Sequence, residues 1–167
     1  WETVLMMLVT LSLYKAMMNL YVKYENQEMV LSAVCGLELV LSLTWLVIGI
    51  SFRNLAAEWL GLSPQLVCCL FASFIFQAVV QCWSLYKRYI YDYKTLVAVT
   101  LLSTVGSTLF GVVAVVFVSP TAEARVLSNT IVMALIGIAL YYSVFKKGKK
   151  FYDKRIWLFS LGFCIPL

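Results

Sequence analysis

Residues 95–118 read TLVAVTLLSTVGSTLFGVVAVVFV, a run without a single charged side chain. A bilayer core of about 30 Å is crossed by a helix of about 20 mainly apolar residues. The strands of a membrane β-barrel would instead alternate apolar and polar residues over about ten residues. This run shows no such alternation. It therefore predicts a membrane-spanning α-helix.

The composition of the whole chain extends this prediction beyond one segment. Of the 167 residues, 63% are hydrophobic and 13% are charged, and the mean hydropathy is +0.92. Soluble domains average roughly 45–50% apolar and about 25% charged residues. The net charge of +5 suggests no nucleic-acid partner, because the basic residues lie between apolar runs rather than along one binding face. We expect membrane lipids to surround this chain.

The apolar runs divide the chain at the length of a bilayer span. We predict one domain, residues 1–167, folded as an all-α, polytopic transmembrane helical bundle with short loops. The predicted spans are 2–22, 29–52, 62–85, 95–118, 124–145 and 156 to the end. Ser63-Pro64 and Ser119-Pro120 each combine a capping side chain with a first-turn proline, which predicts two helix starts. We expect the chain to be incomplete at one or both ends, which leaves open a seventh span.

Lysine and arginine are distributed unequally between the two sides of this predicted bundle. Arg53 and Arg125 fall on one side. Ten fall on the other: Lys23, Lys87, Arg88, Lys94, Lys146, Lys147, Lys149, Lys150, Lys154 and Arg155. Short loops rich in these residues stay in the cytosol. The pattern predicts a multi-pass integral membrane protein with its N-terminal end lumenal or extracellular and its basic loops cytosolic.

Several polar residues interrupt the predicted spans at similar depth. At 1.5 Å per residue, Lys15 lies about 10 Å, Glu38 about 14 Å and Gln77 about 12 Å from the cytosolic end. Because a buried charge is costly, we predict that Lys15 and Glu38 pair between antiparallel neighbouring helices. Asn19 lies one turn from Lys15, and Gln81 one turn from Gln77. These five residues form the candidate intramembrane polar site. It could hold helices together, with Lys15 alternatively extending to the interface, or bind a solute, a proton or a lipid headgroup.

Two further features carry alternative interpretations. Small and hydroxyl residues within 100–111 predict close packing of that helix against the next around Ala134 and Gly137, or a permeation face. The connector KKGKKFYDKR and its flanks could bind anionic lipid at about 1 kcal/mol per basic residue, or could serve only to set the topology. The candidate lipid contacts are Lys146, Lys147, Lys149, Lys150, Lys154 and Arg155.

The sequence offers little for catalysis. It contains no histidine, and its two aspartates, Asp92 and Asp153, both lie in connectors. All five cysteines lie within apolar runs, which favours a packing role, although Cys82 near Lys87-Arg88 is a candidate for S-palmitoylation. We therefore expect no catalytic residues, no metal site, no cofactor and no enzymatic activity.

Three functions remain open on these residues. The first is a non-catalytic subunit or assembly partner of a membrane complex, which would bind other membrane subunits. The second is a transporter, channel or lipid scramblase that uses Lys15, Glu38 and Gln77. The third is a seven-helix receptor, because Lys87-Arg88-Tyr89 is similar to the Asp/Glu-Arg-Tyr motif of that family. A water-accessible cavity at Glu38 would favour transport, whereas a dry pair would favour the subunit.

Overall fold

The computed structural model describes residues 10, 13–60, 63–117 and 122–164, and within them the regular structure is entirely helical. The helices are α2 (Tyr14–Lys23), α3 (Gln27–Ser51), α4 (Arg53–Leu60), α5 (Pro64–Tyr89), α6 (Tyr93–Phe117), α7 (Ala122–Gly148) and α8 (Lys154–Cys164). The predicted all-α fold is thus confirmed for the described residues.

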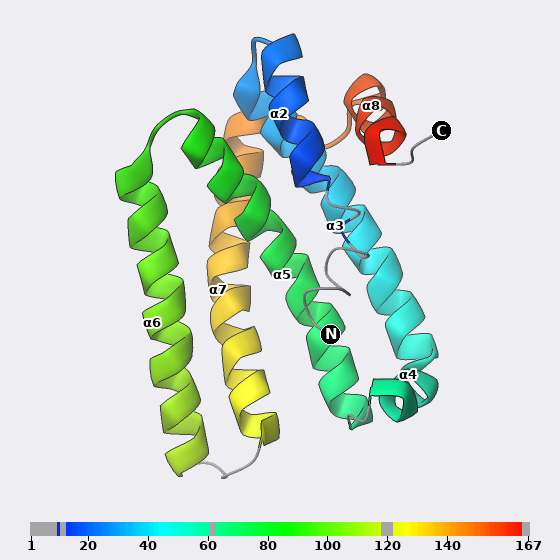
Figure 1. The fold of residues 1–167 in the computed structure, drawn as a ribbon, viewed down its shortest axis with the longest axis vertical. Helices are drawn as coiled ribbons and strands as arrows, with labels where there is room; N and C mark the ends of the chain where they lie inside the picture. Colours follow the sequence, from blue (N-terminus) through cyan, green and yellow to red (C-terminus); the bar gives the residue numbers. More distant parts are fainter. Residues whose placement is uncertain (1–9, 11–12, 61–62, 118–121, 165–167) are drawn as a thin grey trace.

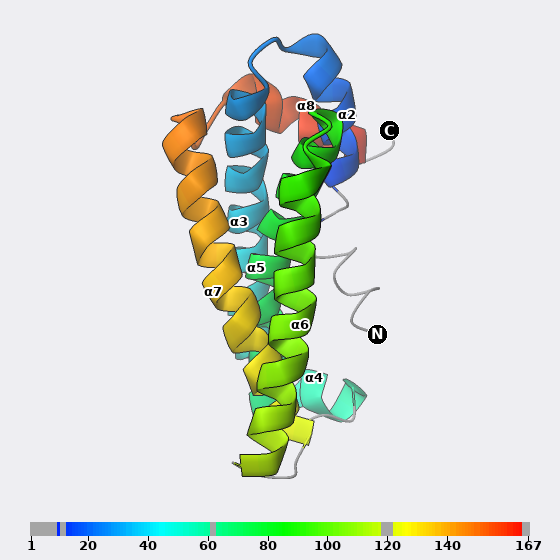
Figure 2. The same ribbon diagram turned by 90° about the vertical axis from the view of Figure 1, so that its left-hand side faces the viewer.

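Four long helices run up and down the length of the molecule. α3, α5, α6 and α7 alternate in direction, and α5 lies between α3 and α7 (Figure 1). α6 contacts mainly α7 and lies on the outside of the bundle, as the turned view shows (Figure 2). α2 and α8 lie together at one end of the bundle, while α4 lies at the other (Figure 1).

These four helices are the candidate membrane spans among the described residues. α3, α5, α6 and α7 have 25 to 27 residues, and each contains an apolar window long enough to cross a bilayer. They correspond to the predicted spans 29–52, 62–85, 95–118 and 124–145. They indicate a membrane-embedded protein.

The predicted count of six spans is not confirmed. Within the first predicted span, 2–22, the structure describes α2, which has 10 residues, while 1–9 and 11–12 lie outside the described residues. Within the sixth it describes α8, which has 11 residues. A helix of this length is about 16 Å long, roughly half of the bilayer core. Apolar composition alone does not distinguish such short helices from spans.

Local capping explains where two of the long helices begin. Pro64 is the first residue of α5, and the Ser63 side chain accepts a hydrogen bond from the Leu66 backbone N–H at 3.4 Å, as predicted. The Asn26 side chain caps α3 in the same way by accepting from the Met29 N–H at 3.2 Å. The second predicted cap, Ser119-Pro120, lies outside the described residues.

The segment that connects the predicted spans 29–52 and 62–85 is itself helical. The stretch RNLAAEWL forms α4, a short helix built largely from residues with high helix propensity. Ala57 is buried there and clusters with Val67, Phe71 and Phe74 of α5. The segment that connects α3 and α5 thus forms a helix, α4, which packs against the first part of α5.

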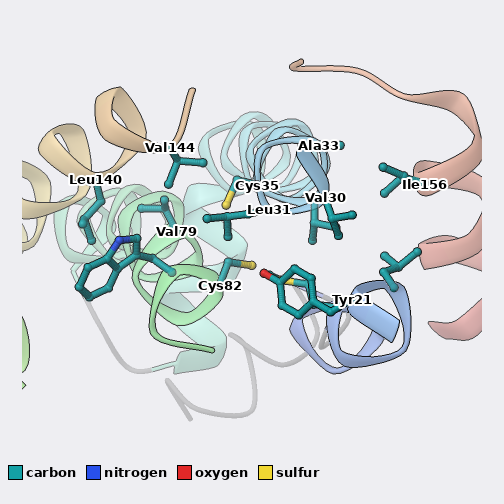
Figure 3. Packing of buried hydrophobic residues seen from close by; sticks show 14 of the residues in the cluster. Tyr21, Val30, Leu31, Ala33, Cys35, Val79, Cys82, Leu140, Val144 and Ile156 are labelled. Atoms are coloured by element: carbon teal, nitrogen blue, oxygen red, sulfur yellow. The ribbon is translucent and has the colours of Figure 1, made fainter. Parts of the chain in front are cut away.

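The main core lies at the α2 and α8 end of the bundle. α2, α3, α5, α7 and α8 all contribute to it, and Figure 3 shows Tyr21 of α2 directed toward Cys82 of α5, beside Cys35 of α3. Gly49 lets α3 approach α5 at the other end, because a Cβ there would overlap the Phe71 ring. The core therefore ties the short helices to the long ones.

Candidate functional site

Glu38 is the one acidic residue enclosed among the described parts of the long helices. Its side chain is 1% exposed, and Cys82 Sγ of α5 donates a hydrogen bond to its carboxylate Oε2 at 3.0 Å. Ser42 Oγ donates to the Glu38 backbone carbonyl at 2.7 Å, one turn further along α3. Cys35, Ser42 and Gly49, which helical periodicity places on the same face of α3 as Glu38, are all buried. α3 and α5 therefore bring the Glu38 carboxyl group and the Cys82 thiol together in the buried interior of the bundle.

Two buried tyrosines, Tyr21 of α2 and Tyr141 of α7, belong to the same core. Tyr21 and Tyr141 are both buried, and the Tyr141 hydroxyl donates to the Ile75 carbonyl at 3.0 Å. Tyr21 stacks near Tyr89, with ring centroids 4.8 Å apart. Cys82, which donates to Glu38, is itself fully buried. Glu38 and Cys82 are therefore enclosed within the described structure.

The other members of the predicted polar site differ in burial, and their meeting with Glu38 stays a prediction. The side chain of Lys15 lies outside the described residues, so its pairing with Glu38 stays a prediction. Asn19 and Gln81 are exposed, and Gln77 is half-buried. The α5 residue that faces Glu38 is Cys82, which lies about 100° around the helix from Gln81. Sequence spacing alone had not linked Cys82 to Glu38.

The burial of Cys82 also bears on the predicted acylation. Its side chain is fully buried, and its thiol is engaged by Glu38. S-palmitoylation requires a thiol that an acyl donor can reach. The structure therefore disfavours Cys82 as an acylation site and assigns it to packing and hydrogen bonding instead.

The basic connector between α7 and α8 is docked on α3. Ser32 Oγ donates to the Lys150 carbonyl at 2.5 Å, and Trp157 Nε1 of α8 donates to the Ala33 carbonyl at 2.9 Å. Gly36 and Gly148 make this approach possible, because a Cβ on either would overlap backbone atoms of the other segment. The connector is thus held against the bundle.

The six candidate lipid contacts are all exposed, although the connector that carries most of them is docked. These are Lys146, Lys147, Lys149, Lys150, Lys154 and Arg155. They lie at the same end of the bundle as Lys23, Lys87, Arg88 and Lys94 (Figure 1). Arg53 and Arg125 lie at the opposite end. The side of the membrane that each end faces, and contact with anionic lipid, remain predictions.

The turn between α5 and α6 carries a well-defined ion pair at this basic end. Lys87 Nζ lies 2.7 Å from Asp92 Oδ2, and Thr95 Oγ1 donates to Asp92 Oδ1 at 2.9 Å. Tyr91 occupies the left-handed region of the backbone map at φ 59°, which lets the chain reverse sharply. The hydrogen bonds from Lys87 and Thr95 lower the pKa of Asp92 from its ordinary 3.8.

The predicted packing of the small residues of α6 against α7 is confirmed for Gly106 and Gly111. A Cβ on Gly106 would lie 3.4 Å from Val132 of α7, and one on Gly111 would lie 3.8 Å from Ser128. The expectation for Gly137 is wrong, because a Cβ there would lie 2.7 Å from Phe76 of α5. Gly137 thus belongs to the α5–α7 interface, since α7 packs between α5 and α6 and presents a different face to each.

A cleft of about 660 Å³ lies between α5, α6 and α7, at the end opposite to the basic connectors. α5 and α6 meet at their tight turn and diverge toward that end, where α7 lies between them (Figure 1). The lining residues are Leu70, Ser73, Ser107, Thr108, Gly111, Val112, Val115, Val116, Arg125, Val126, Asn129 and Thr130. From the sequence, Arg125 counted only toward the topology, and Asn129 was not predicted to belong to a site. Their spacing of four residues on one helix was the available signal.

The chain was compared with known proteins. No protein-family model matches the sequence, and no curated protein and no solved structure matches it significantly. Any functional conclusion must therefore be argued from the residues and their arrangement.

Proposed function

We propose that this protein is a non-catalytic subunit or assembly partner of a membrane complex. The observation that carries the proposal is the enclosure of Glu38, which is 1% exposed and hydrogen-bonded to Cys82. A transport path past Glu38 would need water or a solute to reach its carboxylate. A buried acid–thiol hydrogen bond between two helices favours a role in holding the bundle together.

The position of α6 suggests where a partner would bind. Only 11% of its apolar window is buried inside the bundle, against 44% for that of α3. Leu101 and Leu109 are among the large apolar side chains that α6 presents outward. In a membrane this surface contacts either lipid or another chain, and the proposed role assigns it to another chain.

Site-specific photo-crosslinking in the native membrane tests this assignment. A photoreactive amino acid would replace Leu101 or Leu109 of α6, which are 58% and 60% exposed, and Val47 of α3 provides a matched control at 62%. We expect one discrete higher-mass product from the α6 positions that is absent at Val47. If all three positions yield only the monomer and lipid adducts, the subunit proposal fails.

The native cysteines distinguish this proposal from transport. Cys35 and Cys82 lie at the level of Glu38 and are fully buried. A small, charged, membrane-impermeant thiol reagent should leave both unmodified in the folded protein and modify both after denaturation, as mass spectrometry of peptides would report. Modification of either thiol in the folded protein would indicate a wet path and support the transport alternative.

A further inference from the structure

The cleft between α5, α6 and α7 presents two side-chain donors that are not used elsewhere. Arg125 and Asn129 are four residues apart on α7, and both line the cleft. Among the described residues, no acidic side chain pairs with Arg125, and neither the guanidinium nor the Asn129 amide has a hydrogen-bond partner. A guanidinium matches the geometry of a phosphate group, with which it forms two parallel hydrogen bonds.

The hydroxyl groups of the cleft are already engaged within their own helices. Ser73 donates to the Leu70 carbonyl at 2.8 Å, and Ser107 and Thr108 donate to the Thr104 carbonyl at 3.0 and 2.8 Å. Thr130 likewise donates to the Val126 carbonyl at 2.9 Å. With their protons used, these groups can accept hydrogen bonds but cannot donate to an anion. The inner part of the cleft is therefore unsuited to a free hydrated anion.

The free side-chain donors of the cleft and its engaged hydroxyl groups lie at different depths. Arg125 is three residues past the first residue of α7, about 5 Å from that end of the helix at 1.5 Å per residue. Ser73 is nine residues past the first residue of α5, about 14 Å from the same end of the bundle. Asn129 is seven residues past the first residue of α7, about 10 Å from that end. The two donors thus extend inward from the end of the spans, where lipid headgroups lie, and Ser73, which has no free donor, lies further in.

We propose that this cleft binds a membrane phospholipid, with its phosphate on Arg125 and Asn129 and one acyl chain between α5 and α6. Leu70 of α5 and Val112 of α6 provide apolar wall between the levels of Arg125 and Ser73. The volume of about 660 Å³ lies within the range of roughly 300–1,000 Å³ that is usual for ligand pockets. This site is separate from the six basic residues around the α7–α8 connector, which lie at the other end of the bundle.

Native mass spectrometry of the purified chain in detergent tests the proposal with three probes. These are phosphatidylglycerol, diacylglycerol with the same acyl chains, and inorganic phosphate. We expect retention of phosphatidylglycerol only, because the cleft needs both a phosphate and an acyl chain. Equal binding of inorganic phosphate would overturn the lipid assignment, and equal binding of diacylglycerol would overturn the role of Arg125.

Matched variants then assign the binding to this cleft. Arg125→Gln should weaken phosphatidylglycerol binding by about tenfold or more, because a hydrogen bond to a charged group is lost. Arg53→Gln removes the other arginine at the same end, outside the cleft, and should bind like the wild type. Equal losses from both changes would overturn the proposal by showing a non-specific charge effect.

A third variant addresses the cleft without removing a charge. Gly111 lines the cleft, and a Cβ there would make only ordinary contacts of 3.8 Å or more. The longer side chain of Gly111→Leu extends past this Cβ beside Arg125 and should fill part of the cleft and reduce phosphatidylglycerol binding. A folded Gly111→Leu protein, checked by circular dichroism, that binds this lipid as tightly as the wild type would contradict the proposed position of the chain.

Discussion

Gly137 offers a direct test of how α5 and α7 pack. In Gly137→Ala the added Cβ would lie 2.7 Å from Cβ and Cδ1 of Phe76 and 3.1 Å from its Cα. The Phe76 Cβ is attached to the backbone of α5 and cannot rotate away, so the two helices must move apart. Overpacking of this kind costs about 1–3 kcal/mol. Gly111→Ala is the matched control, because its Cβ would be 3.8 Å from the nearest atom.

The comparison of the two variants isolates this packing cost. Both replace a helical glycine by alanine, so the gain in helix propensity of about 1 kcal/mol is common to them. Gly137→Ala should therefore be less stable than Gly111→Ala by about 1–3 kcal/mol, which corresponds to a melting difference of about 2–12 °C for a chain of this size. Thermal unfolding in detergent, followed by circular dichroism, measures it. Equal midpoints, or a more stable Gly137→Ala protein, would refute the packing described for Phe76.

Three further predictions concern the charged groups. Lys15→Met and Glu38→Gln should each destabilise the protein, and the double variant should show a coupling above about 1 kcal/mol if the two residues pair, whereas additive effects would exclude the pair. Because the folded pKa of Asp92 is lowered, its contribution to stability is present above pH 3.8 and lost as the pH falls through the lower folded pKa. Asp92→Asn should remove that part of the acid dependence of melting, and an unchanged acid dependence would contradict the role of Lys87. Glu123 lies in the first turn of α7, and Lys149 directly follows its last residue. Single cysteines at these two positions should react with an impermeant reagent from opposite sides of a sealed membrane, and reaction of both from one side would overturn the topology.

Length and local chemistry made the long helices predictable. A run such as 95–118 has to satisfy its backbone hydrogen bonds internally in lipid, so an apolar segment of this length specifies a helix without reference to its neighbours. The start of α5 was predictable for the same reason, since Ser63 and Pro64 act on the adjacent turn. The shared face of Glu38, Cys35 and Ser42 followed from helical periodicity alone.

The ends of the bundle were harder to predict. Helix α4 has the residues of a polar connector, and its burial depends on Val67 and Phe71, which follow it in the next helix. The docking of the α7–α8 connector depends on Gly36 of a distant helix. Hydropathy reports how much apolar surface a segment has, but not whether another segment covers it.

The sequence by itself determined the lipid environment, the four long helices and the accumulation of basic residues at one end. The tertiary structure decided that Cys82 meets Glu38 and that Phe76 meets Gly137, and it placed Arg125 and Asn129 along a cleft between three helices. The physical reason is that a membrane helix is apolar on all sides. Its sequence therefore carries little information about its rotation around its own axis, and that rotation is set by close packing against its neighbours.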